Sequence, residues 1–174
     1  MIMIEPLSNI ILKALPRNKK GVIGAQVEVD GVCFHDKLEV CDLKAAYLYN
    51  NRYLLLFVID IDMGLYDEEL YIYLLDYQSK KIVDHVVIGG LTGWLTPSIF
   101  KIGDIEILND DSISFKFISP NGSDGWIIKL FSKPIKSLPW ALKYSPLVTC
   151  PVSFKRYFQI YPNTLVKENC LQDK

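Results

Sequence analysis

Two aspartates, Asp60 and Asp62, come closest in this sequence to a catalytic pattern. Side chains at positions i and i+2 point to the same face of a strand, so two carboxylates spaced in this way could share a divalent cation. The pair comes where an apolar run meets Met63 and Gly64, which is equally typical of a solvated strand end. A metal-dependent enzyme that uses Asp60 and Asp62 is therefore one function to consider, although no nucleotide-binding motif accompanies the pair.

Histidines and cysteines are the other residues that could do chemistry. The two histidines are His35 and His85, and alternation along a strand predicts that Asp84 lies on the face opposite His85, so no local Asp–His dyad is expected. Cys33 and His35 have the i, i+2 spacing, but a fourth ligand and a zinc-knuckle spacing are missing. The cysteines at positions 33, 41, 150 and 170 contain no Cys-x-x-Cys pair, so buried thiols are expected. We expect no catalytic residue, no metal and no cofactor.

Strands are predicted along most of the chain, because β-branched and aromatic residues recur with a period of two between turn residues. Asp30-Gly31 predicts a hairpin turn, and Tyr53 to Ile61 is predicted to be a central strand covered on both faces. In the strand from Leu70 to Tyr77, Leu70, Ile72 and Leu74 are expected on one face and the tyrosines on the other. Further strands are expected at 25–29, 38–49, 82–88, 105–107, 113–117, 126–130 and 154–161.

Two short helices are predicted beside these strands. Leu7, Ile10, Ile11 and Leu15 have the spacing of an amphipathic helix of about two turns. The segment 134–146, which contains Pro139, is expected to hold a short helical piece. The predicted fold is mainly β: an antiparallel meander that forms a sandwich or a partly open barrel, with short helices near the N-terminus and around 134–146.

Size and composition predict one domain that covers residues 1–174. The net charge of −1 argues against a general nucleic-acid-binding protein, which usually has a strong basic excess. The apolar run at 53–59 is far shorter than the roughly 20 residues of a membrane helix, so no membrane association is expected. The N-terminus lacks a basic region before its apolar residues, which predicts a cytoplasmic protein.

Charge is distributed unevenly along the sequence. Residues 53–124 contain twelve acidic and four basic residues, whereas the remaining residues contain eight acidic and fifteen basic ones. Between Tyr53 and Tyr77 there are six acidic residues and no basic one. Acidic side chains beside tyrosines can form a docking surface for a basic protein, since charge accelerates encounter and aromatic side chains anchor the contact. The predicted partner-binding residues are Asp60, Asp62, Tyr66, Asp67, Glu68 and Glu69.

In general character the chain resembles the bacterial immunity proteins of contact-dependent inhibition systems and of secreted polymorphic toxins. The resemblance is carried by the predicted hairpin of residues 70–77 and 80–84 and by the acidic run Asp67-Glu68-Glu69. It implies a non-enzymatic inhibitor that binds a cognate toxin domain, often a basic nuclease, and occludes its active site. Because these families share no common signature, the resemblance assigns no residue a role.

Three functions are therefore considered. The first is a protein-binding module, an immunity protein that neutralises a basic toxin. The second is a β-sandwich or barrel that binds an apolar small molecule, which the aromatic content and the many strands favour. The third is the metal-dependent enzyme described above.

Overall fold

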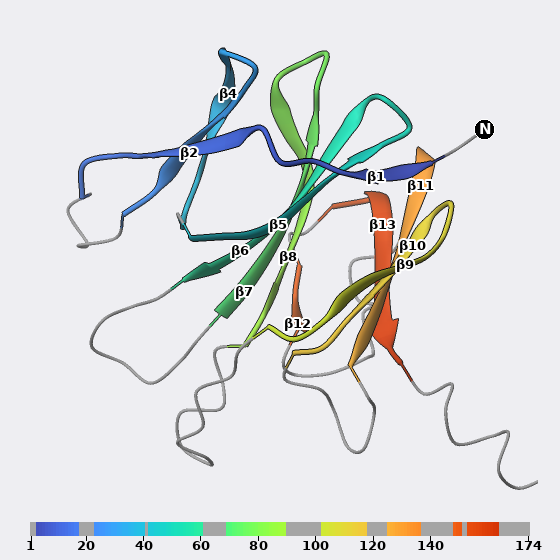
Figure 1. Cartoon of the computed structure of the whole chain (residues 1–174). Coiled ribbons are helices and arrows are strands. Elements are labelled where there is room, and N and C mark those ends of the chain that lie inside the picture. The colour runs from blue at the N-terminus through green and yellow to red at the C-terminus, as the bar shows by residue number, and fades with distance from the viewer. Residues whose placement is uncertain are drawn as a thin grey trace, which may run out of the picture.

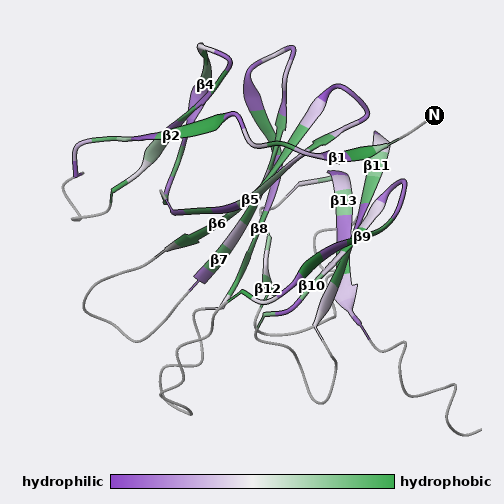
Figure 2. Ribbon diagram, in the orientation of Figure 1, coloured by the Kyte–Doolittle hydropathy of each residue, from purple (hydrophilic) through white to green (hydrophobic). Residues whose placement is uncertain are grey.

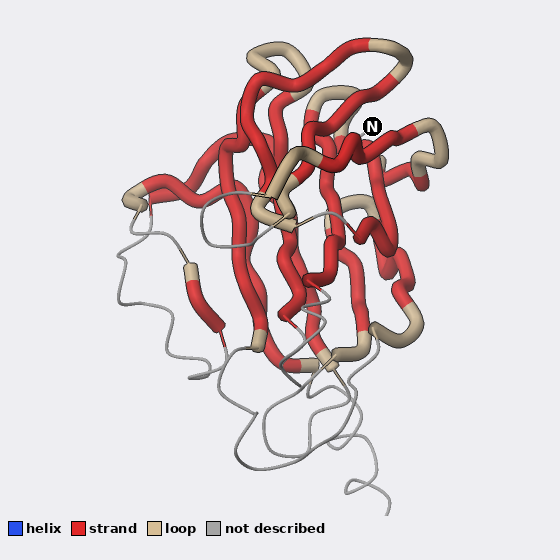
Figure 3. Tube along the Cα trace, turned by 90° about the vertical axis from the view of Figure 1, so that its left-hand side faces the viewer, coloured by secondary structure: helices blue, strands red, loops and turns tan. Residues whose placement is uncertain are grey.

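A computed structural model describes residues 3–17, 23–40, 42–60, 69–89, 102–117, 125–136, 148–150 and 153–163 of the chain. In this part the secondary structure is entirely strand and turn (Figure 3). The first strands in chain order are β1 (Ile4–Pro6), β2 (Ile10–Ala14), β3 (Ala25–Val29), β4 (Val32–Leu38), β5 (Asp42–Tyr49), β6 (Tyr53–Asp60) and β7 (Glu69–Asp76). They are followed by β8 (Lys81–Ile88), β9 (Ile105–Asn109), β10 (Ser112–Phe115), β11 (Trp126–Lys136), β12 (Val148–Thr149) and β13 (Lys155–Pro162).

The strands form three antiparallel sheets. One sheet has six strands in the order β1-β5-β6-β7-β8-β12, one has four in the order β13-β11-β10-β9, and one has three in the order β2-β3-β4. Most neighbours are consecutive in the chain, so the predicted antiparallel meander is confirmed for β2 to β4, β5 to β8 and β9 to β11. Each sheet has two edge strands within the described residues, so none closes on itself.

The three sheets stack as layers, with the six-stranded sheet in the middle (Figure 1). One face of this sheet packs on the four-stranded sheet, in a core that contains Phe57 from β6 together with Phe115, Trp126 and Phe158 from the facing strands. The other face packs on the three-stranded sheet. Hydropathy is consistent with this arrangement, since apolar stretches occur in strands of all three sheets, while the hairpin turns are largely polar (Figure 2).

The central position of β6 explains its continuous apolar sequence. Its odd-numbered residues from Tyr53 to Ile59 belong to the core beside the four-stranded sheet, and Leu54, Leu56 and Val58 belong to the core beside the three-stranded sheet. All seven are at most 3% exposed. The prediction of a central strand covered on both faces is confirmed, and the same two-sided burial is found in β7.

Tight turns connect the meandering strands. Asp30 and Gly31 both have positive φ, +50° and +78°, between the paired residues Val29 and Val32. Two successive positive φ angles define the turn whose twist suits a two-residue hairpin, and glycine adopts that conformation without steric cost. The predicted Asp30-Gly31 hairpin is therefore confirmed.

The predicted N-terminal helix is wrong. Residues 10–14 form β2, which pairs with β3 from Ile10↔Val29 to Ala14↔Ala25. A helix of two turns is marginal on its own, because nucleation costs more than so few hydrogen bonds return. Pairing with β3 gives backbone groups of this segment hydrogen-bond partners on a neighbouring strand, and it leaves Ile11 55% exposed.

The predicted helix around 134–146 is also unsupported. Residues 134–136 belong to the end of β11, where Ile135 pairs with Arg156 and Lys136 with Lys155 across an irregularity in register. Residues 137–147 lie outside the described residues. Among the residues that are described, none belongs to a helix of the length and apolar character needed to cross a membrane.

Candidate partner-binding site

The predicted binding residues lie at one end of the β6–β7 hairpin. Asp60 is the last residue of β6 and pairs in register with Glu69, the first residue of β7. Each strand of this hairpin is paired on both sides, β6 with β5 and β7 with β8, so both ends of the connection are anchored in the middle of the sheet. Asp62, Tyr66, Asp67 and Glu68 occur in this connection and lie outside the described residues.

Glu69 is held in place by a neighbouring tyrosine. The Tyr71 hydroxyl donates a hydrogen bond of 2.7 Å to Oε2 of Glu69. Burial and this hydrogen bond together raise the pKa of Tyr71, so the phenol stays a donor at neutral pH. One carboxylate oxygen of Glu69 is thus bound by a neutral donor at the end of the sheet.

Two tyrosines of β7, Tyr71 and Tyr73, face the core. Tyr71 is 9% exposed and Tyr73 is 3% exposed, and both belong to the core beside the three-stranded sheet. Their rings stack with centroids 5.9 Å apart. The expectation that tyrosines of this strand offer contact area to a partner is therefore wrong for Tyr71 and Tyr73, because the three-stranded sheet covers the face on which they lie.

Ion pairs neutralise part of the acidic segment 53–124. Its Asp76 pairs with Arg52 at 3.0 Å and its Asp111 pairs with Lys129 at 3.9 Å, both with bases from outside the segment. The Arg52 guanidinium lowers the pKa of Asp76 from its usual value. Segregation of charge along the sequence therefore only partly persists in space.

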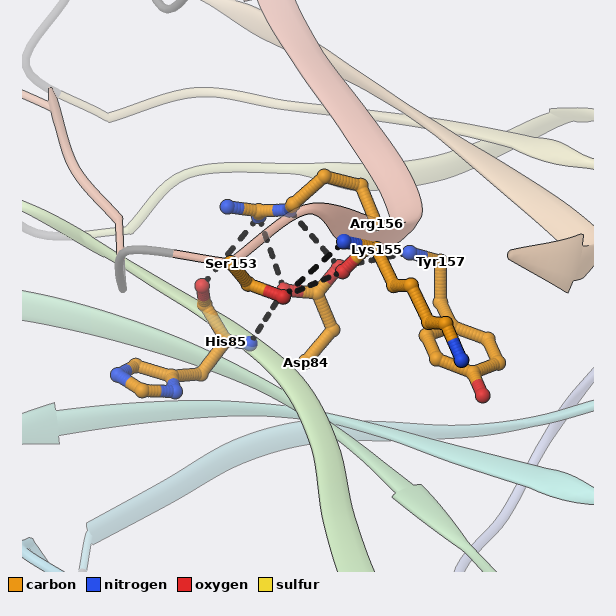
Figure 4. Close-up of polar contacts among 6 residues, drawn as sticks. All are labelled: Asp84, His85, Ser153, Lys155, Arg156 and Tyr157. Atoms are coloured by element: carbon orange, nitrogen blue, oxygen red, sulfur yellow. Dashed lines mark hydrogen bonds and ion pairs between the residues drawn. The ribbon is translucent and has the colours of Figure 1, made fainter. Parts of the chain in front are cut away.

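The most deeply buried charges lie between two sheets. Asp84 on β8 is 3% exposed and Arg156 on β13 is 5% exposed. Asp84 accepts 3.0 Å contacts from Nε and Nη2 of Arg156 and a 2.8 Å hydrogen bond from the backbone N–H of Tyr157 (Figure 4). Burial raises the pKa of Asp84, while the guanidinium and the backbone N–H groups act in the opposite direction. This ion pair joins the six-stranded sheet to the four-stranded sheet.

Strand alternation along β8 could have identified Asp84 as a buried carboxylate. Asp84 occupies the same face as Val86 and Ile88, which are both fully buried, and His85 lies on the opposite face as predicted. A carboxylate at a core position needs a buried partner. The sequence does not indicate which base supplies it, because Arg156 is 72 residues away.

Arg156 has one nitrogen without a partner among the described residues. Nη1 is buried and donates no hydrogen bond within this part of the chain, whereas Nη2 donates to the carbonyl oxygen of His85 at 3.4 Å. The thiol of Cys150 lies beside this guanidinium, and burial raises its pKa. Because the thiolate is the reactive form, a raised pKa makes the Cys150 thiol a weaker nucleophile at neutral pH.

Cys33 lies on the outer face of the three-stranded sheet. Its Sγ lies 3.3 Å from Oε2 of Glu28, which also forms an ion pair with Lys13. The hydrogen bond to Glu28 raises the pKa of Cys33. The expectation of buried thiols is wrong for Cys33, which is exposed.

The two alternative functions gain no support from the described residues. These residues contain no group of three His, Cys, Asp or Glu side chains arranged to hold a metal ion, while Asp62 is not among them. Between the six-stranded and four-stranded sheets, apolar side chains form a core in which the rings of Phe57 and Phe115 are 5.2 Å apart.

Comparisons of the chain with protein-family models, with curated proteins and with solved structures gave no match.

Proposed function

We propose that this chain is a non-enzymatic protein-binding module that presents the acidic end of its β6–β7 hairpin to a basic partner. In its most specific form, the proposal is a cytoplasmic bacterial immunity protein that binds a basic toxin domain, such as a nuclease, and occludes its active site. The contacting residues would be Asp60, Asp62, Asp67, Glu68 and Glu69, with Tyr66 as the aromatic anchor.

The pairing of Asp60 with Glu69 is the observation that supports this proposal most directly. It brings the two outermost of five acidic residues together, and the other three occur in the eight residues between them. The strands below are buried on both faces, so the ends of the connection are fixed before a partner arrives. Binding through such an anchored segment requires less ordering of the chain than binding through a free terminus.

The acidic residues elsewhere in the segment strengthen the choice of this end. Asp76 and Asp84 are buried in ion pairs and are unavailable to a partner. At the end of the hairpin, by contrast, the Glu69 carboxylate accepts a hydrogen bond from the neutral phenol of Tyr71 and forms no ion pair among the described residues. Clustered carboxylates of this kind accelerate the encounter with a basic protein, and the acceleration falls as salt rises.

Charge reversal at the hairpin end tests the proposal. Tagged protein would first be used to isolate a partner at low and moderate salt, and the purified partner would then be used in stopped-flow association. Asp67→Lys with Glu68→Lys is expected to lower the association rate about ten-fold or more at low salt. The matched control reverses Glu5 on β1 and Asp30 in the β3–β4 turn, two exposed acidic residues outside the β6–β7 hairpin, and should change the rate little.

Tyr66→Ala tests the aromatic anchor separately from the charges that accelerate association. Loss of an aromatic anchor should raise the dissociation rate and leave the association rate nearly unchanged. Equal association rates for the wild type and for the Asp67→Lys, Glu68→Lys variant would overturn the proposed site.

A further inference from the structure

Strand β9 is an exposed edge of the four-stranded sheet. It pairs with β10 and has no second neighbour among the described residues. Four of its five residues are exposed, among them Ile107 at 41% and Leu108 at 48%. An edge strand directs unpaired N–H and C=O groups outward along alternate residues, and these groups can pair with another extended chain.

The two faces of β9 differ in chemistry. Ile105 and Ile107 pair with Phe115 and Ile113, which are core residues, so both isoleucines lie on the core face of the sheet. Glu106 pairs with Ser114 on the opposite face. On β10 the residues of this face, Ile113 and Phe115, are buried. Ile107 on β9 is 41% exposed, because β9 is the last strand of the four-stranded sheet. A strand added here would extend the core on one face and meet Glu106 on the other.

Charge around this edge favours one kind of occupant. Residues 104–116 contain Asp104, Glu106, Asp110 and Asp111 against the single base Lys116. Glu106 and Asp110 are exposed and form no ion pair within the described residues, while Asp104 lies 3.6 Å from Lys116 at the surface. A second copy of β9 in antiparallel pairing would bring two such acidic segments together, which is unfavourable.

We propose that the β9 edge binds an extended segment of a basic partner by strand addition, a segment in which apolar and basic residues alternate. The apolar residues would cover Ile107, and the basic residues would lie over Glu106 and near Asp110. Backbone hydrogen bonds would supply sequence-independent affinity, and the alternation would supply specificity. This surface belongs to a different sheet from the β6–β7 end, and the proposal does not depend on the function proposed above.

A labelled synthetic peptide of seven alternating lysines and valines is the probe. Its affinity would be measured by fluorescence anisotropy at low salt, and backbone amide exchange would locate the contact. We expect protection of the β9 amides and weaker binding at higher salt. A glutamate–valine peptide, and a lysine–valine peptide methylated on alternate backbone nitrogens, should each bind about ten-fold more weakly or worse.

Variants of the protein complete the test. Ile107→Ser and Glu106→Lys should each lower the affinity for the lysine–valine peptide several-fold. Val32→Ser removes an apolar residue that is also 41% exposed, on the edge strand β4, and should leave the affinity unchanged. With Asp67→Lys and Glu68→Lys the peptide should still protect the β9 amides from exchange, which separates this proposal from the β6–β7 site.

Three results would overturn the proposal. The first is equal affinity of Ile107→Ser and Val32→Ser for the peptide, and the second is peptide binding without protection of β9. The third is protection of β9 that increases with protein concentration in the absence of peptide, because it would identify a second copy of this chain as the occupant.

Discussion

The two faces of the six-stranded sheet are joined to their neighbours by different kinds of interaction. Toward the four-stranded sheet the core contains a buried ion pair, Asp84 with Arg156. Toward the three-stranded sheet the contacts are neutral or partly exposed: the Glu39 N–H lies 3.3 Å from the Tyr73 hydroxyl, and Nζ of Lys80 lies 5.1 Å from the centre of the Phe34 ring. Adjacent residues of β8 show the contrast, since Asp84 contacts β13 and the His85 ring lies against Tyr73.

This difference predicts two responses to mutation. A buried ion pair costs little while both partners remain, but the loss of one partner leaves an uncompensated charge in the core. When apolar packing is reduced, the free energy of unfolding falls with the buried apolar area that is removed. The loss of an exposed charged contact lowers it only slightly. We therefore expect the first interface to respond sharply to a change of charge and the second to respond gradually to a change of size.

Asp84→Asn should have the largest effect. It keeps the shape of the side chain but leaves the buried Arg156 without a counter-charge, so the free energy of unfolding should fall by about 3–5 kcal/mol. Urea denaturation followed by tryptophan fluorescence would measure it. Asp76→Asn is the matched control, because its partner Arg52 is 44% exposed, and it should cost about 1 kcal/mol.

A double variant sharpens this prediction. Asp84→Asn with Arg156→Met removes both charges and keeps an amide oxygen that can accept from the Tyr157 N–H, so it should be more stable than Asp84→Asn alone, in which the guanidinium is unpaired. If the double variant is the less stable of the two, the cost does not arise from an unpaired charge.

Phe34→Ala should have the next largest effect, on the other interface. Phe34 is fully buried on β4 and contacts Tyr77, with ring centroids 5.7 Å apart. Its removal should cost about 3–4 kcal/mol through lost burial and the cavity left behind. Amide exchange should accelerate more in β3 and β4 than in β10 and β11. Uniform acceleration in all three sheets would show that the layers unfold as one unit.

Lys80→Met should have a smaller effect at the same interface. Nζ of Lys80 lies 3.6 Å from the centre of the Tyr77 ring, and the substitution keeps the length of the side chain while removing its charge. We expect a loss of about 0.5–1 kcal/mol in chemical denaturation. Lys81→Met, at the next and exposed position, is the control and should change stability less.

His85→Gln should have the smallest effect and should depend on pH. Burial lowers the pKa of His85 below 6.5, so the unfolded chain takes up a proton first as the pH falls. The wild type should therefore lose stability as the pH drops below about 6.5, down to the pKa of the folded state, and His85→Gln should lack this loss. The stability difference between the two proteins should narrow from pH 7.5 to pH 5. A constant difference would contradict the prediction.

The sequence pattern predicted the strands well in two cases: continuous apolar runs for strands buried on both faces, and alternating apolar and polar residues for strands with one buried face. The split of β7 into Leu70, Ile72 and Leu74 on one face and Tyr71 and Tyr73 on the other is found as expected. The same reasoning failed at residues 10–14, because a short segment with apolar residues at several spacings fits either a helix or a strand. The partner strand β3 decided between them.

The candidate sites were predictable to different degrees. Clustering along the chain identified the acidic end of the β6–β7 hairpin, and the register of the hairpin brings Asp60 opposite Glu69. The edge at β9 was not predicted, since its sequence reads as an ordinary half-buried strand. Its exposure follows from its position as the last strand of a sheet, and strand order is a property of the tertiary structure.

The sequence by itself determined that the chain is mainly β, where most hairpins turn, and that β6 is central, because these depend on local periodicity and on turn residues. Only the tertiary structure decided which acidic residues are neutralised, which tyrosines are covered and which strand lies at an edge. Arg52 and Arg156 reach Asp76 and Asp84 from 24 and 72 residues away. Such pairings depend on how the sheets stack, and local sequence does not encode the stacking of layers.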